Sequence, residues 1–89
     1  MYKEFQYFLT SYCTLSLDQD DFWSAIQLFI DGEDAEIQHQ LQVELTQIIN
    51  GEQYKTAQNL IEEFGSRALS VSETKEWILH NDQQLKHKK

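Results

Sequence analysis

Five aspartates and two glutamates crowd residues 16–36, SLDQDDFWSAIQLFIDGEDAE, around a short apolar run. Carboxylates at this density could bind calcium, face solvent or dock a basic partner. An EF-hand loop needs oxygen ligands at positions 1, 3 and 5 and a glycine at position 6. Counted from Asp18, position 5 is Phe22 and position 6 is Trp23, so the stretch is not a calcium loop.

The candidates for zinc ligation or catalysis do not form a recognisable site. They are one cysteine and three histidines: Cys13, His39, His80 and His87. Cys13 falls on the inward face of the first helical pattern and is predicted to be a small core residue. Glu36 and His39 are more typical of a surface hydrogen bond than of an acid–base dyad. With no glycine-rich phosphate loop and no CxxC motif, the chain is expected to use no metal or cofactor and not to be an enzyme.

The net charge of −8 is concentrated in the first 65 residues. These hold 12 acids against Lys3 and Lys55, whereas residues 66–89 hold three acids against five bases. A body of this charge repels nucleic acid and anionic lipid and attracts basic proteins. We therefore expect a protein partner, and neither nucleic acid nor a membrane.

The cellular compartment is predicted from the cysteine count and from the apolar runs. A single cysteine excludes an intramolecular disulfide. No apolar run reaches the ~18–20 residues of a membrane span. The N-terminal segment MYKEFQYFL has no small-residue cleavage site and does not read as a signal peptide. These features predict a cytoplasmic protein.

Apolar residues recur at three- and four-residue steps and predict helices, with no convincing strand. The clearest stripe runs through Phe22, Ala25, Ile26, Phe29 and Ile30. Asp31-Gly32 should end that helix, with the glycine in the left-handed conformation. Similar stripes predict four more helices: one across residues 2–12, one with its stripe at residues 37–49, one over residues 53–64, and one carrying residues 77, 78 and 85.

The chain is long enough for one hydrophobic core. We predict an all-α fold, a compact bundle of four to five short helices, as a single domain over residues 1–85. A basic tail, residues 86–89, is expected to be frayed. The predicted core consists of Phe5, Phe8, Leu9, Phe22, Ile26, Phe29, Ile30, Ile37, Leu41, Leu45, Ile48, Leu60, Ile61, Phe64, Trp77 and Ile78.

The chain combines an aromatic N-terminal helix, the segment FWSAIQLFI, a third helix ending LTQIINGE, and SETKEWI near its end. This order resembles the small all-helical immunity proteins of bacterial contact-dependent growth inhibition systems. The resemblance implies a cytoplasmic protein, monomeric when free, that forms a heterodimer with the effector's C-terminal toxin domain and neutralises it. Many such toxins are nucleases with basic clefts. The residues alone leave open a small acidic helical adaptor or regulatory protein, or a nucleic-acid mimic that binds another basic protein.

The acids around the second helix are predicted to serve both helix capping and docking. Asp20, Asp21 and Glu36 favour helix N-termini at about 0.3–1 kcal/mol each. Asp31 falls at a helix C-terminus, where negative charge is unfavourable, and this favours a role outside the fold. Trp23 lies at the edge of the apolar stripe, as a core-boundary residue or an exposed anchor. The hypothesised partner-binding residues are Asp18, Asp21, Trp23, Asp31, Glu33, Asp34 and Glu36.

Overall fold

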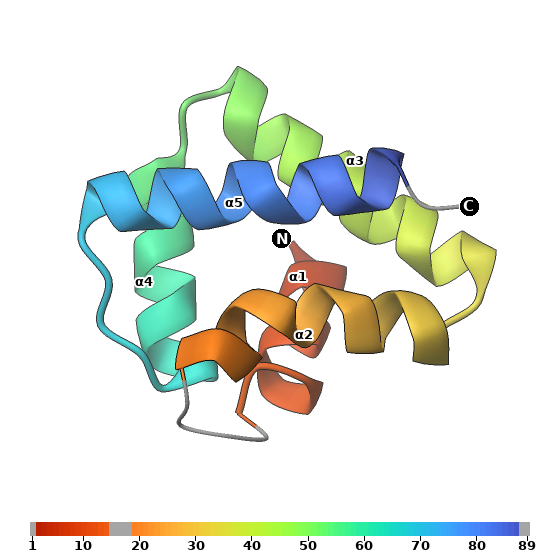
Figure 1. The fold of residues 1–89 in the computed structure, drawn as a ribbon. Helices are drawn as coiled ribbons and strands as arrows, with labels where there is room; N and C mark the ends of the chain where they lie inside the picture. Colours follow the sequence, from red (N-terminus) through yellow and green to blue (C-terminus); the bar gives the residue numbers. More distant parts are fainter. Residues whose placement is uncertain (1, 15–18, 88–89) are drawn as a thin grey trace.

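Amphipathic stripes fold into helices that bury their apolar faces against one another. The computed structural model describes residues 2–14 and 19–87, which form five α-helices and no strand (Figure 1). The helices are α1 (Lys3–Ser11), α2 (Gln19–Gly32), α3 (Ala35–Asn50), α4 (Tyr54–Gly65) and α5 (Val71–Lys86). The predicted all-α fold is confirmed. The expectation that Ser16 or Asp18 caps α2 falls outside the described residues.

Side-chain caps set where α3 and α5 begin. The Asp34 carboxylate accepts a hydrogen bond from the Ile37 N–H at 3.0 Å. Ser70 and Glu73 form a capping box, in which each side chain accepts from the backbone N–H of the other at 3.1 Å. Helix α5 continues through Lys86, so the first residue of the predicted tail belongs to the last helix, and residues 88–89 lie outside the described residues.

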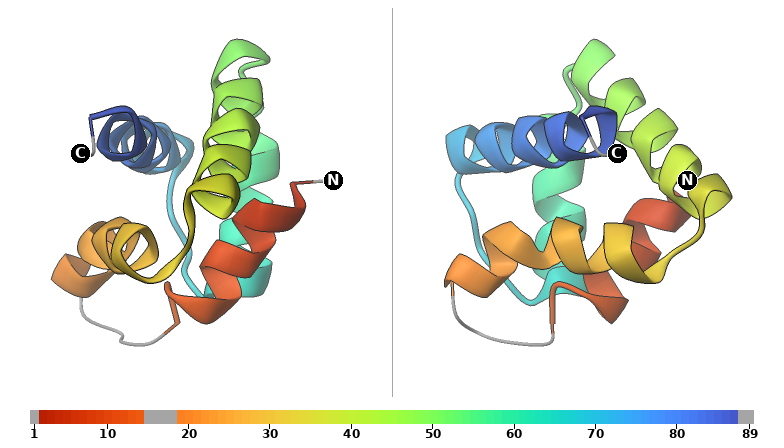
Figure 2. Two further views of the ribbon diagram at one scale, coloured as in Figure 1. Left: turned by 90° about the vertical axis from the view of Figure 1, so that its right-hand side faces the viewer. Right: turned by 45° about the vertical axis from the view of Figure 1, so that its right-hand side comes forward.

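Helices α2 and α5 run side by side in the same direction (Figures 1 and 2). Three pairs along their length fix this register: Phe22 with Trp77, Trp23 with His80, and Gln27 with Gln84. Helix α5 also packs on α3 and α4, and α1 packs on the same two helices. The last helix therefore packs along three of the other four helices, and its Trp77 side chain also reaches Phe5 and Phe8 of α1.

The core is built around Trp77, which is fully buried. Its indole stacks on Phe22 with 4.4 Å between ring centroids and on Phe8 with 5.8 Å. Phe8 in turn meets Phe29 edge-on at 5.2 Å. Such aromatic pairs are worth about 0.5–1.5 kcal/mol each beyond the area they bury. Aromatic side chains thus join α1, α2 and α5 in one cluster, and the predicted core position of Trp77 is confirmed.

Twelve of the 16 predicted core residues are buried, and so is Cys13. The other four predicted core residues are only half-buried and pack against the edge of the core: Ile30, Ile37, Leu60 and Phe64. Each lies at the margin or the end of its helix's apolar stripe, where solvent still reaches one side of the chain. Three polar residues of α5 that were not predicted are also buried: Thr74, Asn81 and Asp82.

Candidate functional site

The predicted docking residues fall into two groups at opposite ends of α2. Asp21 lies in the first turn of α2, next to Trp23. Asp31 lies in the last turn of α2, and the other acids follow within the next five residues, at Glu33, Asp34 and Glu36. Asp31 follows Asp21 by ten residue steps, which correspond to about 15 Å along the helix axis. Asp18 lies outside the described residues.

Glu33 is held by two tyrosines of the first helical segment. Its Oε2 accepts hydrogen bonds from the hydroxyls of Tyr7 at 2.7 Å and Tyr12 at 2.5 Å. These bonds to a carboxylate favour the neutral phenols and raise the pKa of both tyrosines above the ordinary value. Gln38 completes the cluster by donating to the backbone carbonyls of Ile30 and Glu33 at 2.8 and 2.7 Å. Glu33 therefore ties the α2–α3 turn to α1.

Gly32 permits this cluster through its lack of a side chain. The expectation that it takes the left-handed conformation is wrong, because none of the glycines has a positive φ. Instead Gly32 is the last residue of α2, and a Cβ there would lie 3.1 Å from the Tyr12 hydroxyl. The sequence correctly indicated a special role for Gly32, but the physical reason is the close approach of the Tyr12 hydroxyl and not a left-handed backbone.

Three of the predicted docking acids have no bonding partner among the described residues, although Asp21 and Glu36 lie in the first turns of α2 and α3, where negative charge favours the helix. Asp21, Asp31 and Glu36 are exposed, and their carboxylates form no hydrogen bond or ion pair within the described part of the chain. Asp34 is also exposed, but it caps α3. No lysine or arginine occurs between Lys3 and Lys55 to balance these charges. The exposed carboxylates at the two ends of α2 are therefore negative charges that no lysine or arginine of residues 4–54 balances.

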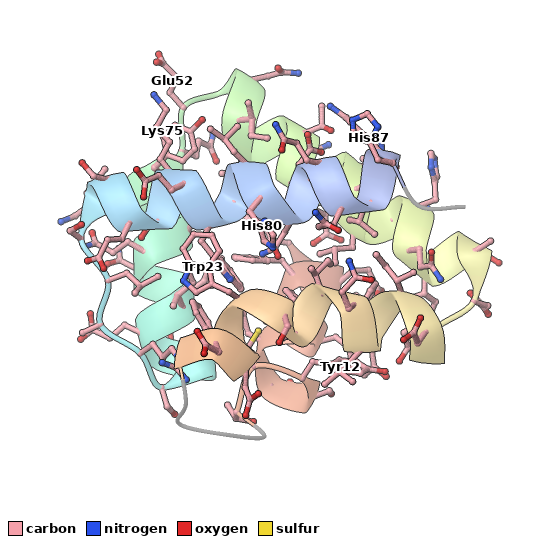
Figure 3. All side chains as sticks on the ribbon, in the orientation of Figure 1. Tyr12, Trp23, Glu52, Lys75, His80 and His87 are labelled. Atoms are coloured by element: carbon pink, nitrogen blue, oxygen red, sulfur yellow. The ribbon has the colours of Figure 1, made fainter. Side chains whose placement is uncertain are left out.

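Trp23 lies at the boundary between the core and this surface, as its position on the stripe predicted. It is half-buried, and its indole meets the His80 ring edge-on with 5.2 Å between centroids. Figure 3 shows the two side chains together between α2 and α5. The Nε2–H of His80 donates to the Trp23 carbonyl oxygen at 3.1 Å, since a carbonyl can only accept. Sequence reasoning considered His80 only as a possible metal ligand or catalytic residue, and it missed the contact with Trp23 because 57 residues separate the two.

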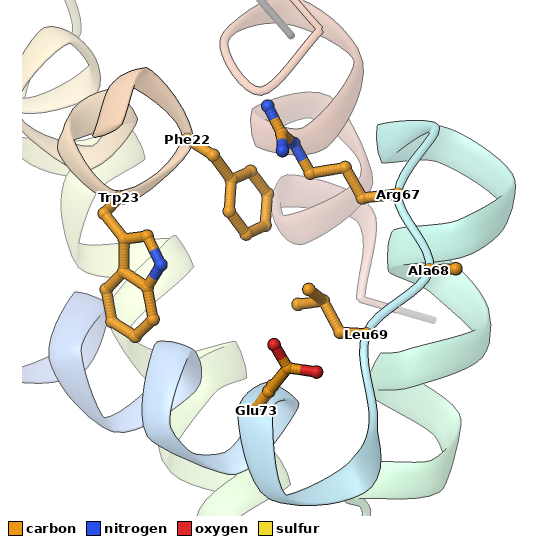
Figure 4. Close-up of a pocket in the computed structure, with 6 residues that line it drawn as sticks. All are labelled: Phe22, Trp23, Arg67, Ala68, Leu69 and Glu73. Carbon is orange, nitrogen blue, oxygen red and sulfur yellow. The ribbon is translucent and has the colours of Figure 1, made fainter. Parts of the chain in front are cut away.

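Two hollows lie on either side of Trp23. One, of about 300 Å³, is open and lined by Asp20, Trp23, Ser24, Gln27, His80 and Gln84. The other, of about 210 Å³, lies under the α4–α5 loop (Figure 4). It is lined by Phe22, Trp23, Arg67, Ala68, Leu69 and Glu73. The Arg67 guanidinium covers the Phe22 ring at 4.5 Å from its centroid, and Trp23 is the wall that both hollows share.

No group of three or more His, Cys, Asp or Glu side chains among the described residues could hold a metal ion. Burial raises the pKa of the Cys13 thiol, which keeps it protonated and a poor nucleophile. None of the helices in the described ranges is long and apolar enough to cross a membrane.

Comparisons of the chain with protein-family models, with curated proteins and with solved structures found no match.

Proposed function

We propose that this chain is an immunity protein that binds and neutralises the basic toxin domain of a contact-dependent growth inhibition effector. One observation carries the proposal. Asp21, Asp31 and Glu36 present carboxylates that no described residue bonds, on a chain with no lysine or arginine across residues 4–54. A negative surface of this kind accelerates association with a basic protein and disfavours nucleic acid and anionic lipid.

The distribution of polar bonds supports binding rather than catalysis. The carboxylates of Glu33 and Asp34 are engaged in the fold, so they contribute charge to the surface while holding their geometry. The exposed acids beside them are free to meet the lysines and arginines of a partner. The protein would act in the cytoplasm as a monomer when free and as one half of a heterodimer with the toxin domain.

Growth protection tests the function directly. The gene immediately upstream is expected to encode a very large secreted effector, whose C-terminal domain can be expressed from an inducible promoter. Cells that make this domain should stop growing, and cells that also make the present chain should grow. The two proteins should co-purify as a one-to-one complex. Failure of both protection and co-purification would refute the proposal. A stable complex with a different basic protein would favour an adaptor role.

A matched pair of charge variants tests the surface. The first variant is Asp21→Asn, Asp31→Asn and Glu36→Gln. The control, Glu62→Gln, Glu63→Gln and Glu76→Gln, removes three exposed carboxylates from α4 and α5. Each of the two variants removes three negative charges. At low salt the first variant should associate with the toxin domain about tenfold more slowly than the wild type.

The control should show a clearly smaller loss than the first variant. High salt should bring the rates together, because it screens exposed charges. Equal rates for the two variants at every salt concentration would mean that only net charge matters and that these acids are not the docking surface.

A further inference from the structure

The outer face of α2 carries one large apolar side chain that the fold does not bury. The buried face of this helix is formed by Phe22, Ala25, Ile26 and Phe29. Leu28 lies off that face and is 51% exposed, the highest exposure of any large apolar side chain among the described residues. A single exposed leucine is common on protein surfaces, so its meaning depends on the groups around it.

Leu28 belongs to a row of exposed residues along the helix, which we call the α2 row. Its four members follow one another at steps of three, four and three residues and share one side of α2: Asp21, Ser24, Leu28 and Asp31. Figure 2 shows α2 at the outside of the bundle, with no described helix beyond it. Along the axis, Leu28 lies about 10 Å from Asp21 and about 4.5 Å from Asp31. The row therefore places an apolar group between two carboxylates.

The groups of the α2 row are available to a partner. The carboxylates of Asp21 and Asp31 form no hydrogen bond or ion pair within the described residues. The Ser24 hydroxyl is turned back onto the helix, where it donates to the backbone carbonyl of Asp20 at 2.8 Å. Ser24 is also small, so a partner can approach Leu28 over it without leaving the hydroxyl unbonded.

We propose that the α2 row is the face on which the toxin domain docks. The Leu28 side chain enters an apolar depression of the partner, and a lysine or arginine of the partner meets each carboxylate. The inference rests on the proposed function for the identity of the partner and adds the contact face. An apolar centre with a charged rim is the usual order of a protein interface. The partner must therefore present two bases about 15 Å apart, with apolar surface between them.

Charge complementarity selects a basic protein over a second copy of this chain. Two copies that met through the α2 row would bring four aspartates together, and each chain has a net charge of −8. Residues 4–54 contain no lysine or arginine that could pair with them. A partner with a purely apolar surface would remove Asp21 and Asp31 from water without replacing their hydration, which is unfavourable.

Truncation of the apolar centre gives the first test. Val43 of α3 provides the matched control, because it is aliphatic, 37% exposed and outside the row. Leu28→Ala should weaken toxin binding about tenfold, chiefly through faster dissociation and equally at low and high salt. Val43→Ala should weaken it less than about twofold. Surface plasmon resonance gives both rate constants, and urea unfolding should show wild-type stability for both variants. A loss for Leu28→Ala no larger than that for Val43→Ala would overturn the proposal.

A second pair of variants blocks the row instead of truncating it. Ser24→Arg adds bulk and a positive charge between Asp21 and Leu28, whereas Gln47→Arg adds the same side chain at an exposed position of α3. Ser24→Arg should weaken toxin binding at least about tenfold, and Gln47→Arg less than about threefold. Equal weakening by the two would reduce the effect to net charge and contradict the proposed face.

The outcomes separate the face from the function. If the wild type binds the toxin domain while Leu28→Ala and Ser24→Arg behave like their controls, the toxin domain docks elsewhere and the immunity function stands. If the wild type neither binds the toxin domain nor protects cells, the proposed function fails, and the docking face is refuted with it. Sedimentation of the chain alone should show a monomer. A dimer that Leu28→Ala dissociates would show that a second copy covers the row, against the proposal.

Discussion

The two ends of α2 use acidic side chains for different purposes. At the C-terminal end, Glu33 accepts from two phenols and Asp34 caps α3. At the N-terminal end, the Asp21 carboxylate is exposed and forms no hydrogen bond or ion pair within the described residues. The comparison shows that a dense run of acids is not one surface. Whether a carboxylate holds the fold or remains available depends on which donors the tertiary structure brings to it.

The Phe29 side chain anchors the C-terminal end of α2, just before Glu33, in the core. The Phe29 ring contacts Phe8 at 5.2 Å and Tyr12 at 5.4 Å between centroids, and the side chain is fully buried. Phe29→Ala should therefore lower the free energy of unfolding by about 3–5 kcal/mol. Its neighbour Leu28 is 51% exposed, and Leu28→Ala should change stability by less than about 0.5 kcal/mol. Urea unfolding of both variants measures the difference, and similar midpoints would contradict the placement of the core.

Glu44, like Glu33 and Asp34, is a carboxylate that holds the fold, and it does so at the start of α1. Tyr2 at the N-cap of α1 has a left-handed backbone and offers no side-chain cap. Instead Glu44 of α3 accepts from the N–H groups of Glu4 and Phe5 at 3.0 Å each. Glu44→Ala would leave these two donors without their partner and should cost about 1–2 kcal/mol.

The exposed Glu62 of α4 provides the control for this change, because Glu62→Ala should cost less than about 0.5 kcal/mol. Thermal unfolding followed by circular dichroism gives both values. An equal cost for the two would mean that α1 is held by packing alone.

The α1–Glu33 contact also gives stability a pH dependence. The folded state raises the pKa of Tyr12 because its hydroxyl donates to a carboxylate. The stabilisation is present below the ordinary tyrosine pKa of about 10 and declines as pH rises above it, since the unfolded chain then loses the proton more readily. Glu33→Gln removes the charge and should make this decline shallower. Urea unfolding between about pH 8 and pH 11 tests it, and parallel slopes for the two proteins would show that the carboxylate does not control the phenols.

Much of the fold follows from local spacing. Helix stripes predicted the five helices and most of the core, because a buried face repeats every three to four residues. The same spacing places Asn81 inward, four residues from both Trp77 and Leu85, but its polar type hid this position. The bonds that define the site join distant segments. His80 meets Trp23, and Glu44 meets Phe5, with no periodic signal in the sequence to connect them.

Asp31 gives the smallest expected effect, but it tests most directly whether an acid that bonds nothing in the fold is kept for binding. It lies in the last turn of α2, which contains no basic residue, and its carboxylate bonds nothing in the described part of the chain. A negative charge at a helix C-terminus opposes the helix dipole. Asp31→Asn should therefore raise the free energy of unfolding by about 0.3–1 kcal/mol at low salt, and less at high salt. Asp34→Asn keeps a capping side chain and provides the matched control, which should be neutral or slightly destabilising. Chemical unfolding at two salt concentrations measures both effects.

If Asp31→Asn lowers stability instead, its charge serves the fold. If it stabilises the free protein while slowing toxin association, Asp31 is kept for binding at a cost to the helix that carries it.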